Sequence, residues 1–127
     1  MTDQTYRKIF LAGAVWNLLG AGLFFLFWRA AFAFLQLEHP NYLAFFQAWL
    51  ALAFVFGIGY YDVSRDLYGN TNIVRLGIYG KTAFAVIFIY HVLFSNFHPV
   101  FLGGAVIDIA FVVLYALFLV HARARRA

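Results

Sequence analysis

Four nearly unbroken apolar runs limit what this chain can fold into more than any other feature of its sequence. They span residues 8–28, 42–61, 73–95 and 100–120. A helix needs about 20 apolar residues to cross the roughly 30 Å hydrocarbon core of a bilayer, and each run reaches that length. Apolar residues make up 65% of the sequence and charged residues 11%, whereas soluble domains average about 45–50% and 25%. We therefore predict an all-α integral membrane protein, a four-helix transmembrane bundle that forms a single domain over residues 1–127.

The segments between the runs are short. Residues 30–38 cannot span a membrane, and their aromatic and aliphatic side chains predict a short helical segment lying in the interface. Residues 62–72 form the most polar loop, in which Asn70 and its neighbours offer an N-cap for the next helix.

Two short internal matches compete as signs of a repeat. His-Pro precedes the second and fourth runs, at residues 39–40 and 98–99, as a tandem duplication of a helical hairpin would produce. Residues 13–17 (GAVWN) instead resemble residues 104–108 (GAVID), which pairs the first run with the fourth. Coincidences of this length are expected in so apolar a chain, so we do not take either match as evidence of a true repeat.

The positions of Lys and Arg predict the orientation in the membrane. If the helices alternate in direction, eight of the nine basic residues fall on one side and Arg29 falls on the other. The eight are Arg7, Lys8, Arg65, Arg75, Lys81, Arg123, Arg125 and Arg126. Because Lys and Arg are enriched in cytoplasmic loops, both termini and the 62–72 loop are predicted to be cytoplasmic, in a bacterial-type inner membrane. The net charge of +4 follows from this topology, so we expect no nucleic-acid partner.

The absence of cysteine excludes disulfides and every cofactor that is held by thiolates. A metal would have to be bound by imidazole and carboxylate groups. Glu38, His39 and His98 are predicted to lie at the outer face and could supply such groups, but their spacing is not that of a metal site. We therefore predict no metal, with these three residues as the alternative.

Four polar side chains lie inside the apolar runs at similar predicted depths. They are Asn17, Gln47, His91 and Asp108. At 1.5 Å per residue from the outer ends of the helices, they lie between about 8 and 17 Å deep. We predict that they form an intramembrane polar cluster, because polar groups in spanning helices face the protein interior. Asn17 lies between Gly13 and Gly20 on one helical face, where we expect the closest approach of another helix.

Asp108 is the strongest candidate for a functional residue, because a carboxylate in hydrocarbon costs about 2.5–3.5 kcal/mol. Lys81 lies about 12 Å farther from the outer side by the same count. We therefore expect its ammonium group to extend to the cytoplasmic headgroups, which leaves His91 as the predicted partner of Asp108. The structural alternatives are that Asp108 only fixes helix register, that His91 is a hydrogen-bonded core imidazole, and that Asn17 and Gln47 form interhelical hydrogen bonds.

The whole chain resembles small bacterial four-helix membrane proteins of the DoxX-like kind. The resemblance lies in Trp16-Asn17 early in the first run, Gly80-Lys81 in the third, and Asp108 ahead of a helix end rich in Phe and Leu. It implies the four-helix membrane fold and, for some members, an accessory or quinone-linked role beside membrane oxidoreductases. It assigns no catalytic residue.

Three functions fit these observations. The leading interpretation is a non-catalytic accessory or binding subunit for lipid or quinone that acts with partner proteins. The alternative is a small oligomeric transporter or proton-coupled carrier that uses His91 and Asp108. The third is an intramembrane enzyme acting on a lipid-borne substrate, which the lack of a catalytic motif disfavours. The expected partners are membrane lipids, together with further copies of the chain or the subunits of a larger membrane complex.

Overall fold

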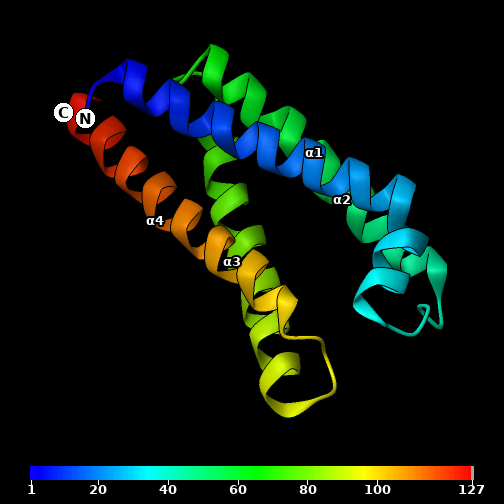
Figure 1. Ribbon diagram of the computed structural model, residues 1–127. Coiled ribbons are helices and arrows are strands. Elements are labelled where there is room, and N and C mark those ends of the chain that lie inside the picture. Colours follow the sequence, from blue (N-terminus) through cyan, green and yellow to red (C-terminus); the bar gives the residue numbers. More distant parts are fainter. Residues whose placement is uncertain (127) are drawn as a thin grey trace. The chain divides into compact units, whose positions relative to one another are not determined.

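The computed structural model describes residues 1–126 and consists of four long α-helices joined by short connections (Figure 1). The helices are α1 (Asp3–Leu35), α2 (Leu43–Arg65), α3 (Thr71–Phe94) and α4 (Val100–Arg126). No β-strand is present among residues 1–126. Each helix is long and apolar enough to cross a membrane. The all-α class and the four helices of sufficient length and apolarity to cross a membrane are as the sequence predicts, and they indicate a membrane protein.

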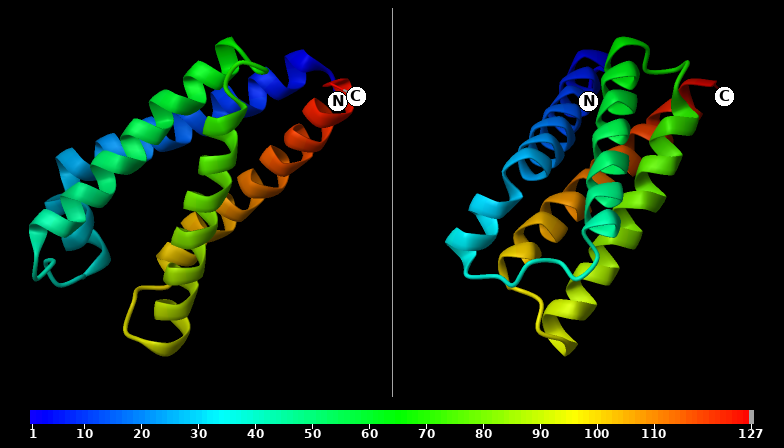
Figure 2. Two further views of the ribbon diagram at one scale, coloured as in Figure 1. Left: turned by 180° about the vertical axis from the view of Figure 1, so that it is seen from behind. Right: turned by 90° about the vertical axis from the view of Figure 1, so that its right-hand side faces the viewer.

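The helices pack in consecutive pairs, α1 with α2 and α3 with α4. Each pair is an antiparallel hairpin (Figure 2). The chain therefore divides into two compact units, of which the first ends at Arg65 and the second begins at Asp66. Each hairpin contains one of the His-Pro pairs in its turn, and the single domain expected from the sequence stays a prediction.

α1 is longer than the first apolar run and includes most of the segment that the sequence predicts to be interfacial. The backbone of Phe27, with φ −118° and ψ 25°, interrupts the helix with a kink. Beyond the kink the helix continues to Leu35, and Gln36 ends it in the left-handed conformation, with φ 57° and ψ 39°. The N–H of Leu37 then donates to the carbonyl of Phe32 at 2.8 Å, which satisfies one of the last carbonyls of the helix. The predicted boundary at residue 28 is thus a kink within one helix.

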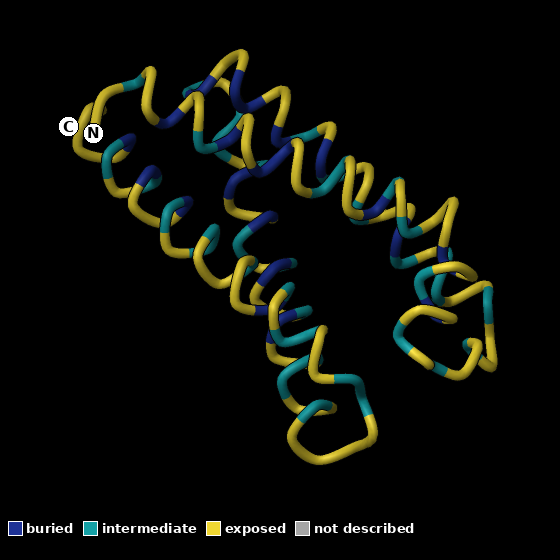
Figure 3. The backbone as a smooth tube through the Cα atoms, viewed as in Figure 1, coloured by how far each residue is buried: buried dark blue, intermediate teal, exposed yellow. Residues whose placement is uncertain are grey.

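The first hairpin buries one stripe of α1 against α2. The buried side chains recur every three, four or seven residues along α1, and Figure 3 marks the buried stretches of the backbone in dark blue. They include Phe10, Ala14, Ala21, Trp28 and Phe32. This period is that of an α-helix with a single packed face.

Gly57 of α2 gives the closest approach between the two helices of this hairpin. A Cβ atom at Gly57 would lie 2.9 Å from Cγ of Leu18 and 3.0 Å from Cβ of Asn17. Gly13 of α1 is buried as predicted, but Gly20 is exposed and a Cβ there would meet nothing within 4 Å. The predicted stripe is therefore wrong at Gly20, because the packed face continues from Asn17 to Ala21, one residue farther round the helix.

Three contacts define the register of the second hairpin. The rings of Phe88 and Phe101 lie 6.0 Å apart. Seven residues before Phe88 and seven after Phe101, Lys81 meets Asp108. Thirteen residues before Lys81 and thirteen residues after Asp108, Oη of Tyr68 lies 3.1 Å from Nε2 of His121. α3 and the connection before it thus keep one constant register against α4 over most of its length.

The turn after α3 folds back before α4 begins, and this sets the register. The N–H groups of Ser95 and Phe97 both donate to the carbonyl of His91, at 2.9 and 3.4 Å. Phe97 then stacks on Phe101 with 4.3 Å between ring centroids. Since Phe88 is level with Phe101, the last turns of α3 extend past the start of α4.

The connection between α2 and α3 is shorter than the predicted loop, because α2 continues to Arg65 and only residues 66–70 are non-helical. Asn70 occupies the N-cap position of α3. Its side-chain amide donates to the carbonyl of Asp66 at 2.9 Å, so the residue stabilises the turn through that bond.

Candidate functional site

Lys81 of α3 and Asp108 of α4 form an ion pair inside the second hairpin. Nζ of Lys81 lies 2.8 Å from Oδ1 of Asp108, the length of a charge-assisted hydrogen bond. The Lys81 side chain is 4% exposed and that of Asp108 is 19% exposed. Two opposite charges are therefore held together where the hairpin is otherwise packed with apolar groups.

The pair lies far from either end of α3. Lys81 is ten residues from the first residue of the helix and thirteen from the last, or about 15 and 20 Å at 1.5 Å per residue. The ring of Phe111, one turn beyond Asp108 on α4, has its centroid 5.3 Å from Nζ of Lys81. The ammonium group is thus stabilised by a carboxylate and by the face of an aromatic ring.

Burying these two charges is tolerable only because they are buried together. An isolated charge in a low-dielectric interior carries a penalty of several kcal/mol, which mutual attraction and good hydrogen-bond geometry offset. Removing one partner of such a pair costs about 3–5 kcal/mol, whereas replacing both by apolar side chains is often nearly neutral. The chain therefore gains little stability from the pair as a whole, and this makes a purely structural account of it weak.

This arrangement corrects two expectations. The predictions that Lys81 extends to the cytoplasmic headgroups and that His91 is the partner of Asp108 are both wrong, since Lys81 donates directly to Asp108. The predicted axial offset assumed that the last residue of α3 and the first residue of α4 lie at the same depth. Because α3 overhangs the start of α4, Lys81 and Asp108 instead lie level with each other.

His91 lies in the overhanging part of α3 and is exposed. Its Nδ1 is 3.1 Å from Oγ of Ser95, and its ring centroid is 6.5 Å from that of Phe97. The imidazole therefore contacts the turn that follows α3, and it lies apart from the carboxylate of Asp108.

Asn17 and Gln47, both in the first hairpin, do not pair with each other. Nδ2 of Asn17 donates to the carbonyl of Ala53 at 2.9 Å, an interhelical bond of the kind that the structural alternative predicts. Gln47 lies six residues before Ala53, about 9 Å along the helix, and it is half-buried. Of the four residues in the predicted polar cluster, only Asp108 is a member of the ion pair.

The residues named as an alternative metal site have other roles or are exposed. The ring of His39 packs against Trp28 with centroids 5.0 Å apart, and Nδ1 of His98 accepts from the N–H of Val100 at 3.0 Å. Glu38 is exposed. Among residues 1–126 there is no group of three or more His, Asp or Glu side chains that could hold a metal ion.

Sequence reasoning missed the role of Lys81 as the partner of Asp108. The spacing of the two charged residues from Phe88 and Phe101 identifies the pair only once the register of α3 against α4 is known. Lys81 lies two helical turns before Phe88 and Asp108 lies two turns after Phe101, so a ring contact between Phe88 and Phe101 implies a contact between the two charges.

No family model, curated protein or solved structure matches this chain. The resemblance to DoxX-like proteins therefore stays a prediction, and the function has to be inferred from the ion pair and its surroundings.

Proposed function

We propose that this chain is a non-catalytic accessory protein of a bacterial inner membrane, which binds a lipid-soluble molecule, a quinone or a lipid, through Lys81 and Asp108. The observation that supports the proposal is the 2.8 Å ion pair in the middle of an apolar hairpin. Sites for small molecules are mostly apolar, with a few polar groups that fix the orientation of the ligand. One donor and one acceptor beside the ring of Phe111 suit a molecule that is apolar except for one oxygen-bearing end.

The chemistry of Lys81 supports an oxygen-bearing ligand. An ammonium group donates hydrogen bonds to oxygen acceptors, and a quinone carbonyl and a lipid ester or phosphate oxygen are acceptors of that kind. The exposure of the pair is uneven, with 4% for Lys81 and 19% for Asp108. A ligand lying in the membrane beside the hairpin would therefore reach the pair from the side of the carboxylate.

The test is to identify what the protein carries when it is purified. The wild-type chain and the double variant Lys81→Met/Asp108→Leu would be extracted from the same membranes in mild detergent, and their bound quinones and lipids measured by mass spectrometry. We expect the wild type to be enriched in one quinone or lipid species, and the double variant to retain at least about tenfold less, because a charge-assisted hydrogen bond is worth about 1.5–3 kcal/mol. Replacing both charges together should leave the hairpin folded.

Asn17→Leu, which removes a polar contact from the first hairpin, is the matched control and should keep the wild-type ligand content. If the wild type carries only the bulk lipid mixture, or the double variant keeps the enriched species, the proposal is wrong.

The second candidate is a proton-coupled carrier, now based on Lys81 and Asp108 in place of His91 and Asp108. Two ionisable groups inside a spanning helical pair are the observation that favours it, since such residues often mark proton pathways. Proteoliposomes containing a pH-sensitive dye would distinguish the two functions. A carrier would collapse an imposed pH gradient faster with the wild type than with Asp108→Asn, whereas a binding protein would leave both rates at the level of empty liposomes.

A further inference from the structure

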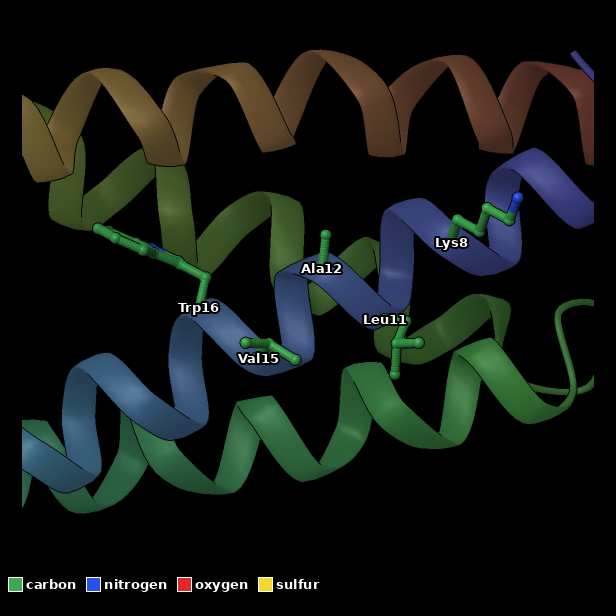
Figure 4. A pocket seen from close by; sticks show the side chains of 5 residues that line it. All are labelled: Lys8, Leu11, Ala12, Val15 and Trp16. Carbon is green, nitrogen blue, oxygen red and sulfur yellow. The ribbon is translucent and has the colours of Figure 1, made fainter.

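α1 carries a shallow apolar groove with a cation at one end (Figure 4). Its lining consists of Lys8, Leu11, Ala12, Val15 and Trp16. These residues follow the spacing of one helical face, at intervals of three and four. The short side chain of Ala12 lies between the longer ones of its neighbours, and this difference in length forms the hollow.

The groove lies largely outside the face of α1 that packs against α2, with Leu11 and Val15 at its edge nearest that face. Successive residues of an α-helix are turned by about 100°, so Phe10 and Asn17, which face α2, point about half a turn away from Lys8. Leu11, Val15 and Trp16 keep 45%, 47% and 37% of their surface exposed. The groove is therefore available to a molecule that approaches α1 from outside this hairpin.

The two adjacent basic residues at this end of α1 have different roles. Nη1 of Arg7 donates to the carbonyls of Ser64 and Arg65, at 3.2 and 3.0 Å, where it caps the C-terminus of α2. Lys8 is exposed and takes part in no hydrogen bond or ion pair found within residues 1–126. Its positive charge is thus left for a ligand at the end of the groove.

We propose that the groove binds an anionic phospholipid, with the phosphate at Lys8 and one acyl chain along Leu11, Ala12, Val15 and Trp16. The positive charge of Lys8 and the length of the groove both fit this ligand. Lys8 directly precedes the apolar part of α1, at the level of lipid headgroups, and Trp16 lies eight residues farther, or about 12 Å. One leaflet contributes roughly 15 Å of hydrocarbon, so an acyl chain that starts at Lys8 has the reach to pass Trp16.

The headgroup preference follows from the net charge of the lipid. Phosphatidylcholine carries its own cation beside the phosphate, whereas phosphatidylglycerol does not, and a lysine near the surface favours the anionic lipid by about fivefold. This inference concerns the first hairpin and does not rest on the ligand proposed for Lys81 and Asp108.

Quenching of Trp16 by brominated lipid tests the proposal. The chain has three tryptophans, so a Trp28→Phe/Trp49→Phe variant leaves Trp16 as the reporter. In proteoliposomes at equal low mole fraction, brominated phosphatidylglycerol is expected to quench Trp16 more strongly than brominated phosphatidylcholine. Lys8→Gln should abolish this difference, and Ala12→Leu, which fills the groove, should weaken quenching by both lipids. Arg123→Gln also removes one positive charge and should keep the difference.

Because Trp28 belongs to the core, native mass spectrometry of the chain with all three tryptophans provides a second measurement. Bound phosphatidylglycerol should exceed phosphatidylcholine about fivefold for the wild type, and the two should be equal for Lys8→Gln. Equal quenching by the two lipids, or a difference that persists in Lys8→Gln, would overturn the proposal. No quenching by either lipid would overturn it as well, because another helix would then cover this face.

Discussion

Lys81 can reach Asp108 because its side chain is long and flexible and because the residues around the pair are apolar. Four methylene groups let the ammonium group follow the surface of α3 to the carboxylate while the stem packs against neighbouring side chains. The side chain is 4% exposed, so little of the pair is screened by solvent. An arginine would present a planar fork in place of a compact ammonium and would not be equivalent here.

Gly57→Val should destabilise the first hairpin, because the new Cβ would lie 2.9 Å from Cγ of Leu18. Overpacking of this kind costs about 1–3 kcal/mol. Gly20→Val is the matched control, since a Cβ at Gly20 meets nothing within 4 Å. Thermal unfolding in detergent would compare the two variants. Equal losses from both would show that α2 does not approach α1 at Gly57.

Part of the site could be predicted from residue type alone. A carboxylate in an apolar run is costly wherever it lies, so Asp108 stands out in the sequence. Its partner depends on register, which is decided by how residues 95–99 fold, and no local pattern specifies that turn. His91 illustrates this dependence. In the predicted register it lies level with the carboxylate of Asp108, whereas in the observed register, a few residues different, it lies beside the turn.

Among the helices, α1 differs most from its predicted form. Its 33 residues extend about 50 Å, well beyond the hydrocarbon core of a bilayer. Composition marks where a helix leaves the apolar layer, whereas hydrogen bonds and caps determine where it ends. The sequence therefore located the apolar part of each helix well and the ends of α1, α2 and α4 poorly.

Engineered cysteines can test the register of α3 against α4, since the chain has no cysteine of its own. The pair Phe88→Cys/Phe101→Cys replaces rings whose centroids are 6.0 Å apart, so a short reagent that reacts with two thiols should cross-link the two cysteines. Phe88→Cys/Phe111→Cys is the control, with the second site ten residues, or about 15 Å, farther along α4. A gel-shift assay of both pairs would report the result, and preferential cross-linking of the control pair would refute the register.

At the scale of the whole molecule, four helices that can span a membrane are the feature that the sequence predicted best. The reason is physical, because backbone groups in lipid must be satisfied within the segment and only helices or closed barrels achieve this. The pairing of these helices into two hairpins depends on side-chain contacts such as the bond from Asn17 to Ala53. Composition cannot reveal such contacts, and the four-helix bundle stays a prediction.

Topology is the next prediction, and it rests on the bias of basic residues towards one side of the membrane. Single cysteines would be placed at Glu38, Asn96 and Asn70 and labelled in intact cells with a reagent that does not cross the inner membrane. We expect labelling of the first two positions and protection of the third. Labelling at Asn70 in intact cells would reverse the predicted orientation.

The most direct test of this account is a double-mutant cycle between Lys81 and Asp108. The free energy of unfolding would be measured in detergent for Lys81→Met, Asp108→Leu and the double variant, with His91→Met in place of Lys81→Met as the control cycle. We expect each single change at the pair to cost about 3 kcal/mol and the double change to cost less than either, because each single change leaves a buried charge without its partner. The changes at His91 and Asp108 should add within about 0.5 kcal/mol. Additive costs at Lys81 and Asp108, together with strong coupling between His91 and Asp108, would contradict the site described here.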